Sequence, residues 1–397
     1  MKKFFIFLFF LIVIDFILSQ LFFLDILYKK KIITHKNDIE NRLPNKDYVY
    51  GFKENAKFES RYHNGFNNLD YLIYTNNLGF RDSSIRELQK SKTYSIVIGD
   101  SFVEGTGLKY EDTLVAILNN KLKNRKFEFL NAGVASYSTY IYKKKIETVL
   151  NDNKWLKINS VILFYDKSDI YDDLKFFGKP ETFSTEKKIY KNPKKEKLIK
   201  DIKNFKIGSI LTEQTMIGIF YREILGGSLE KLVQNIKFRK KLSKDLNLNF
   251  FSINKIQTNT LYSTHQYKWL QKYLLPPLWE EKSLQSIEFA FENFKDLKVF
   301  LEKRNIKLYV VIYPWPLELI NKEIKKNYLD FVEKKFKQNE INNIIIYNEF
   351  VGENVAEIIY RYYLPKDIHF NKKGNSILSD RIYERLSKDN LLKEKSN

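Results

Sequence analysis

Two short motifs carry side chains from which a nucleophilic site could be built. Ser101 stands in Gly99-Asp100-Ser101-Phe102, directly after an apolar run, and His369 follows Asp367 by two residues near the end of the chain. An imidazole beside a hydroxyl can take its proton, and a carboxylate can orient that imidazole. The order Ser, Asp, His is one of the recurring orders of such triads.

One further motif could stabilise negative charge on a reacting oxygen. Asn131-Ala132-Gly133 follows a second apolar run, where a backbone N–H such as that of Gly133 could face an oxyanion. Each motif taken alone also fits an ordinary turn, so its role depends on whether the fold brings these loops together.

The motifs follow segments typical of buried strands. Helical patterns, with apolar residues three and four apart, separate most of these segments. This alternation predicts an α/β fold with a central parallel sheet of about five strands covered by helices on both faces. Ligands of such sheets bind at the carboxyl ends of the strands, where the motifs lie. The predicted strands are Tyr94–Ile98, Phe127–Leu130, Ser160–Phe164, Leu308–Tyr313 and Ile344–Tyr347, and the predicted helices are Glu111–Lys123, Tyr140–Leu150, Leu284–Lys303, Leu317–Lys337 and Lys373–Leu386.

The beginning of the chain predicts a membrane anchor. Lys2 and Lys3 precede two apolar stretches, 4–14 and 16–28, and a cluster of lysines, 29–31, follows them. Together the stretches exceed the about 20 residues that cross a bilayer. The alternative is a cleavable signal peptide, but the sequence near Ser19 fits a cleavage site poorly, so we favour an uncleaved anchor. The flanking charges leave its orientation open.

The domain organisation follows from these segments. Between the third and fourth predicted strands lies a long stretch with helical and polar character but no repeated strand-helix unit. We therefore predict a core in two parts, separated by a largely helical insertion or cap. The predicted boundaries are 1–30 for the N-terminal transmembrane helix, 31–92 for an N-terminal extension, 93–173 and 284–397 for the core, and 174–283 for the insertion.

Composition excludes several kinds of site. The chain has no cysteine, which removes disulfides, thiolate nucleophiles and cysteine-bound zinc. Its four histidines are far apart, so no metal site is expected. The net charge of +20 arises from lysines spread over nearly every segment and not from one basic stripe, so we expect no nucleic-acid partner.

Together the motifs resemble those of the SGNH (GDSL-like) hydrolase family, in its membrane-anchored bacterial form. Asn76-Asn77-Leu78-Gly79-Phe80-Arg81 is also similar to the segment that precedes the catalytic domain there, and the likeness covers about 76–174 and 284–386. It implies a three-layer sandwich. It also implies Ser101 as nucleophile, His369 as base and Asp367 as orienting acid, with Ser101 and Gly133 N–H groups and the Asn131 motif at the oxyanion or substrate-binding site.

The chain departs from the family pattern at two places. Ser168 stands where the family has an asparagine whose side chain is a third oxyanion donor, and Asp367 precedes His369 by two residues where many members have three. The loss of one oxyanion donor costs about 3 to 4 kcal/mol of transition-state stabilisation. The first departure therefore predicts reduced activity or an altered substrate.

The resemblance implies a serine esterase that acts on small acyl esters, such as acetyl groups on surface carbohydrate, without a metal or organic cofactor. The expected location is the membrane, held by a single span, with the catalytic domain exported. Two alternatives stay open. One is an O-acetyltransferase component of a polysaccharide-modifying system, and the other is a non-catalytic carbohydrate-binding protein on the same scaffold.

Overall fold

The structure is a computed structural model. It describes residues 42–63, 68–123, 126–173, 281–320, 322–352, 355–365 and 367–392, and six positions between 7 and 15. Almost all of the predicted anchor and of the predicted insertion lies outside these residues. Within the described ranges, no helix has both the length and the apolar character needed to cross a membrane.

The chain divides into two compact units. One unit comprises residues 1–37 and 184–250, of which only the six positions between 7 and 15 are described. The other comprises residues 38–183 and 251–397, and it contains every described residue from Arg42 onward. The sheet, the helices and the candidate site described below all belong to this second unit.

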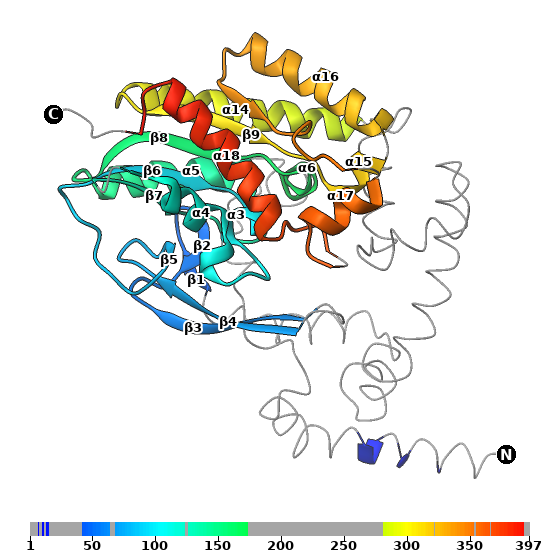
Figure 1. The fold of residues 1–397 in the computed structure, drawn as a ribbon. Coiled ribbons are helices and arrows are strands. Elements are labelled where there is room, and N and C mark those ends of the chain that lie inside the picture. Colours follow the sequence, from blue (N-terminus) through cyan, green and yellow to red (C-terminus); the bar gives the residue numbers. More distant parts are fainter. Residues whose placement is uncertain are drawn as a thin grey trace. The chain divides into compact units, whose positions relative to one another are not determined.

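The described residues of this unit form an eight-stranded sheet in the order β10-β9-β8-β6-β7-β5-β4-β3 (Figure 1). The five strands from β10 to β7 run parallel, and β5, β4 and β3 continue the sheet antiparallel. A separate two-stranded hairpin precedes them. The strands are β1 Arg42–Asn45, β2 Val49–Phe52, β3 Lys57–His63, β4 Asn68–Thr75, β5 Arg81–Asp82, β6 Thr93–Ile98, β7 Phe127–Asn131, β8 Lys157–Phe164, β9 Lys307–Ile312 and β10 Asn343–Ile345.

The predicted α/β class and all five predicted parallel strands are confirmed. These strands could be predicted because strands covered on both faces are almost continuously apolar in sequence. In β6, for example, every residue is buried. The prediction of about five strands was incomplete, since β3 to β5 extend the sheet. In β4, Tyr71 and Ile73 are buried while Leu72 is exposed, so one face of this part of the sheet lies open and its sequence pattern is weaker.

Helices cover the two faces of the parallel part, as the predicted three layers require. On one face α4 packs against α18, and Ser379 Oγ of α18 donates to Leu114 O of α4 over 3.2 Å. On the other face α5 packs against α14 (Figure 1). The helices are α3 Ser101–Glu104, the 3-10 turn Tyr110–Asp112, α4 Leu114–Lys121, α5 Thr139–Asp152, α6 Lys167–Asp172, α14 Glu281–Glu302, α15 Pro316–Ile320, α16 Lys322–Gln338, α17 Val355–Tyr362 and α18 Lys372–Lys388.

A buried ion pair joins α6, which follows β8, to α15, which follows β9. Lys167 Nζ lies 3.0 Å from Glu318 Oε2, and both side chains are fully buried. Burial raises the pKa of Glu318, while the charge of Lys167 opposes that shift. Glu318 also accepts hydrogen bonds from Trp315 N and Tyr347 OH, each over 2.7 Å. Because both charges have lost their water, the pair is stable only as long as both members are present.

We predict that Lys167→Met lowers the free energy of unfolding by about 3 to 5 kcal/mol, because it leaves the Glu318 carboxyl buried without its counter-charge. The double variant Lys167→Met/Glu318→Gln should recover much of this loss. Lys121→Met, which removes the half-exposed ion pair with Asp380, should cost less than about 1 kcal/mol and serves as the control. Urea unfolding measures all three, and equal losses for Lys167→Met and Lys121→Met would contradict the prediction.

Candidate active site

The loops that carry the predicted motifs meet at one edge of the sheet. β6 pairs with β7 on one side and with β8 on the other, all parallel, so the loops after these three strands leave the same edge. The chain passes from β6 to β7 and then crosses to β8, which makes β6 the point where the connections diverge. Ligands of α/β sheets bind at the carboxyl edge beside such a point.

Ser101 begins the short helix α3, immediately after β6. Asp100 caps this helix, and its Oδ1 accepts the N–H of Phe102 over 3.0 Å. The N–H of Ser101 belongs to the first turn, which has no acceptor within the helix. A side chain at Gly99 would lie 2.5 Å from Val103 Cγ2 and 2.9 Å from Phe164 Cβ, so the turn requires glycine at this position. The turn therefore presents both the hydroxyl and the N–H of Ser101 at the edge of the sheet.

The opposite end of α3 is held by Arg81. Its Nη1 donates to Glu104 O over 2.7 Å and to Gly105 O over 2.9 Å, and its Nη2 donates to Leu108 O over 2.7 Å. The side chain is fully buried and lies over the ring of Tyr71. Arg81, which ended the motif Asn76–Arg81 in the sequence, thus satisfies the carbonyl end of the helix that carries Ser101.

The structure brings Ser101, His369 and Asp367 into one hydrogen-bonded line. His369 Nε2 lies 2.8 Å from Ser101 Oγ, and His369 Nδ1 lies 2.7 Å from Asp367 Oδ1. The ring of His369 rests against the ring of Phe102, with 4.8 Å between centroids. With Nδ1 protonated and directed at Asp367, Nε2 is free to accept the proton of the Ser101 hydroxyl.

The two-residue spacing between Asp367 and His369 is accommodated by a tight turn. Asp367 Oδ1 accepts the N–H groups of Ile368 over 2.5 Å and of His369 over 3.2 Å, in addition to its bond with the imidazole. Leu364 N donates to His369 O over 2.8 Å and closes the loop. Asn371 then caps α18 by accepting from two N–H groups of its first turn. This turn directs the Asp367 carboxylate at Nδ1 despite the short spacing.

The charges of this pair favour an ionised carboxylate and a basic imidazole. Burial lowers the pKa of His369, but the charge of Asp367, its hydrogen bond to Nδ1 and the charges of Asp100 and Asp166 together outweigh burial, so the pKa lies above the ordinary value of 6.5. Burial raises the pKa of Asp367, but the charge of His369 and the hydrogen bonds from the imidazole and from two N–H groups together outweigh burial, so that pKa lies below its ordinary value. Asp367 therefore stabilises the protonated form of the imidazole.

Asn131 and Gly133 are occupied with holding the loop after β7. Asn131 Nδ2 donates to Val103 O over 2.8 Å, and Asn131 Oδ1 accepts the N–H of Gly133 over 3.1 Å. A side chain at Gly133 would lie 2.4 Å from Glu104 N, so glycine is required here by the close approach of α3. The predicted donor at Gly133 is therefore already satisfied within its own loop.

The first free N–H of this loop belongs to Ser136, which the sequence did not indicate. Ala132, Val134 and Tyr137 donate to backbone oxygens, and Ala135 donates to Glu104 Oε2. Ser136 has a φ of 63° and is exposed, and its N–H has no hydrogen-bond acceptor in the described part of the chain. A left-handed turn residue is usually read from glycine, and here a serine occupies the position.

Ser168 lies near the nucleophile, but its hydroxyl is directed elsewhere. Its Oγ donates to Asp166 Oδ1 over 2.6 Å, and its N–H donates to the same oxygen over 2.8 Å as part of the cap of α6. Asp100 Oδ2 lies 3.5 Å from Ser168 Oγ and also 3.5 Å from Ser101 Oγ. Asp100 Oδ2 thus lies between the hydroxyls of Ser168 and Ser101, and the hydroxyl proton of Ser168 is donated to Asp166.

Sequence reasoning also missed Asp166, a buried carboxylate that accepts hydrogen bonds from two side chains near the site. Its Oδ2 accepts from Tyr313 OH and from Trp315 Nε1, each over 2.7 Å, so it joins the ends of β8 and β9. Burial, followed by the nearby charge of Asp166, raises the pKa of Asp100 well above its ordinary value. The available signal was that Asp166, like Asp100, follows a buried strand closely.

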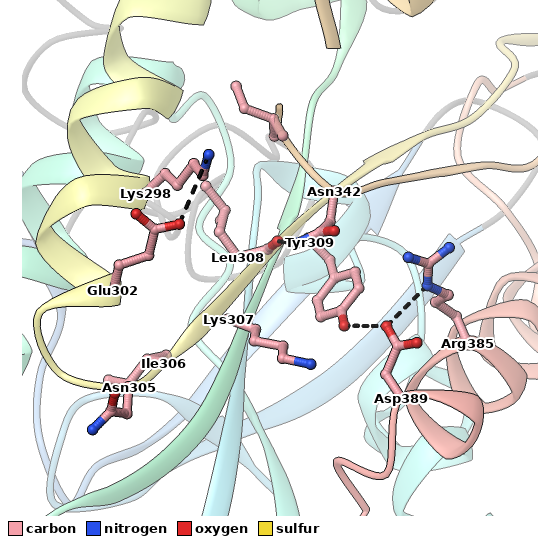
Figure 2. A pocket seen from close by; sticks show the side chains of 11 residues that line it. Lys298, Glu302, Asn305, Ile306, Lys307, Leu308, Tyr309, Asn342, Arg385 and Asp389 are labelled. Carbon is pink, nitrogen blue, oxygen red and sulfur yellow. Dashed lines mark hydrogen bonds and ion pairs between the residues drawn. The ribbon is translucent and has the colours of Figure 1, made fainter. Parts of the chain in front are cut away.

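A hollow of about 600 Å³ lies elsewhere, toward the amino end of β9 (Figure 2). Four of its charged residues form ion pairs, Lys298 with Glu302 and Arg385 with Asp389. Arg385 and Asp389 stand at the far end of α18 from His369, about 25 Å along the helix axis. This hollow is therefore separate from the candidate site. Across the described ranges, no three histidine or carboxylate side chains are arranged to hold a metal ion.

Comparisons with known proteins find likeness in structure only. No family model and no curated protein matches the sequence. Similar solved structures include a member of the lipolytic protein G-D-S-L family from Veillonella parvula, 11% identical, with a TM-score of 0.34 and coverage of 74% of this chain and 98% of that chain. A GDSL-like lipase from Bacteroides thetaiotaomicron is 11% identical, with a TM-score of 0.34 and coverage of 76% and 91%. A catalytic mutant of an acetylxylan esterase from Geobacillus stearothermophilus is 8% identical, with a TM-score of 0.35 and coverage of 75% and 96%.

We predict that His369 titrates above 6.5 in the wild-type chain and at a lower pH in Asp367→Asn, because the substitution removes the largest of the interactions that oppose burial. NMR titration of the imidazole signals measures both values, with His369→Gln identifying the resonance among the four histidines. Asp47→Asn, which replaces an exposed carboxylate, is the matched control and should leave the value unchanged. An equal pKa in wild type and Asp367→Asn would show that the carboxylate does not act on the ring.

Proposed function

We propose that this chain is a serine esterase that hydrolyses small acyl esters, with acetyl groups on surface carbohydrate as candidate substrates. The observation that carries the proposal is the hydrogen-bonded line from Asp367 through His369 to Ser101, with contacts of 2.7 and 2.8 Å. A serine, a histidine and a carboxylate in this arrangement have the geometry of acyl-transfer catalysis.

In the acylation step, His369 Nε2 takes the proton of Ser101 as Oγ attacks the ester carbonyl carbon. The carbon–oxygen double bond opens to an oxyanion, and Asp367 stabilises the imidazolium that has formed. When the intermediate collapses, the bond to the alcohol oxygen breaks, and the imidazolium donates its proton to that oxygen. The products are the free alcohol and an acyl group bound to Ser101 Oγ.

In the deacylation step, His369 takes a proton from water, and the resulting hydroxide attacks the acyl carbon. The second intermediate collapses with departure of Ser101 Oγ, which regains its proton from the imidazolium. The carboxylic acid is released and the starting state is restored. Every proton transfer uses Nε2 of one imidazole, and this explains the need for an orienting partner at Nδ1.

For the oxyanion we propose the N–H groups of Ser101 and Ser136 as donors, with Ser136 in the place first predicted for Gly133. Both are free of intramolecular acceptors in the described residues, whereas the Gly133 N–H donates to Asn131. Ser168 becomes a donor to substrate only if its hydroxyl turns away from Asp166. Free N–H groups are suited to this role because they need not break a bond before the reaction.

The decisive test is labelling with a fluorophosphonate, which modifies only an activated serine. We expect the wild-type chain to be labelled at Ser101, and hydrolysis of p-nitrophenyl acetate to fall at least about 10³-fold in Ser101→Ala. Ser83→Ala, at an exposed serine after β5, is the control and should behave as wild type. Equal rates in wild type and Ser101→Ala would refute the esterase proposal.

The same preparations separate the two alternative functions. An O-acetyltransferase would transfer the acyl group to an added oligosaccharide faster than it releases free acetate, with the same dependence on Ser101. A carbohydrate-binding protein would remain unlabelled by the fluorophosphonate and would keep its affinity for carbohydrate in Ser101→Ala. Product analysis by mass spectrometry distinguishes these results from simple hydrolysis.

We also propose that residues 1–30 anchor the protein to a membrane, with the catalytic domain exported. The support is the apolar sequence between two groups of lysines, of the length that a bilayer requires. The full chain should sediment with membranes and resist extraction by carbonate, whereas the fragment 31–397 should not. Recovery of both forms in the soluble fraction would contradict the anchor, and protease protection of the full chain would report which side the domain faces.

A further inference from the structure

The hairpin β1–β2 contacts the loop between β7 and α5. Arg42 Nη1 donates to Ala135 O over 3.0 Å, and Tyr50 OH donates to the same oxygen over 2.8 Å. In return, Tyr137 OH donates to Tyr50 O, and the two rings pack with 5.2 Å between centroids. The N-terminal extension is therefore joined to the loop that carries Ser136.

The same loop is joined to the helix of the nucleophile through Glu104. This last residue of α3 accepts the N–H of Ala135 at Oε2 over 2.5 Å. Its carboxylate also receives Arg42 Nη2, at 3.1 and 3.3 Å from the two oxygens. The side chain of Glu104 is only 4% exposed, so the ion pair with Arg42 compensates a charge that has little access to water.

These contacts fix the orientation of the peptide between Ala135 and Ser136. A trans peptide is planar, so its C=O and its N–H point in opposite directions. Because Ala135 O is held toward the hairpin by two donors, the N–H of Ser136 points away from the hairpin. The positive φ of Ser136 is disfavoured for a residue with a side chain, and it persists only where the surroundings hold it.

We propose that Arg42 is a positioning residue of the oxyanion site, which holds Ala135 O and the Glu104 carboxylate together and thereby aims the Ser136 N–H at the reacting carbonyl oxygen. This inference rests on the proposed esterase function and extends it to the hairpin. A guanidinium suits the task because its planar fork serves two acceptors in a fixed geometry, which an ammonium group cannot reproduce. Tyr50 OH donates a second hydrogen bond to Ala135 O.

The test compares Arg42→Met, Arg42→Lys and Tyr50→Phe in the full chain, with kcat and KM for p-nitrophenyl acetate as the readout. An oxyanion donor acts in the transition state, so we expect kcat to fall while KM stays unchanged. The expected loss of kcat for Arg42→Met is about 10- to 100-fold. This is smaller than the loss of about 10²- to 10³-fold in kcat that follows removal of an oxyanion donor itself. Arg42→Lys and Tyr50→Phe should show smaller losses of the same kind.

Arg61→Met is the matched control, because Arg61 lies in the outermost strand β3 and pairs only loosely with Glu59 and Asp70, at 3.9 and 3.7 Å. It should retain wild-type kcat. Added methylguanidine should restore part of the kcat of Arg42→Ala and leave Arg61→Met unaffected, a response that a purely structural arginine would not give.

The proposal is overturned if kcat in the Arg42 variants stays within about twofold of Arg61→Met, or if only KM changes. If Arg42→Met fails to fold by circular dichroism, Arg42→Lys and Tyr50→Phe decide the question in the same way. A wild-type chain whose hydrolysis does not depend on Ser101 would instead refute the proposed function. The two failures are thus distinguishable in one set of measurements.

Discussion

The hydrogen bond from His369 Nε2 to Ser101 Oγ joins residues 268 positions apart, and the surrounding structure is built to preserve it. On the serine side, a cap from Asp100 and three hydrogen bonds from Arg81 hold both ends of a helix only four residues long. On the histidine side, the turn around Asp367 and the start of α18 fix the imidazole. Since α3 is too short to be stable alone, it depends on its supports from elsewhere in the chain.

Two aspartates beside the same imidazole have opposite electrostatic surroundings. Asp367 has backbone donors and the ring of His369, and its pKa lies below the ordinary value. Asp100 is buried near Asp166, and its pKa lies well above the ordinary value. Environments that push apart the pKa values of nearby carboxyl groups assign them different roles. Here the Asp367 carboxylate can balance an imidazolium, whereas burial beside Asp166 shifts the pKa of Asp100 in the opposite direction.

The N-terminal extension is part of the architecture that carries the site. Its strand β5 pairs with the end of β7 through Arg81 and Asn131, and its hairpin β1–β2 reaches the loop after β7. Sequence patterns divided this segment from the core, because strands with one open face and a hairpin of four-residue strands give weak periodicity. Arg81, which holds α3, ends the motif Asn76–Arg81, whereas Arg42 and Tyr50, which hold the Ser136 loop, come from outside the segments that the motifs identified.

The sequence by itself determined the class of fold, the five parallel strands and the three residues of the hydrogen-bonded line, because continuous apolar runs and short polar motifs are local properties of the chain. Only the tertiary structure decided the strand order, and with it which loops face Ser101. It also decided that the Gly133 N–H donates to Asn131 and that, among the described residues, the N–H of Ser136 has no acceptor. Hydrogen-bond partners of a loop are set by segments distant in sequence, so no local pattern could assign them.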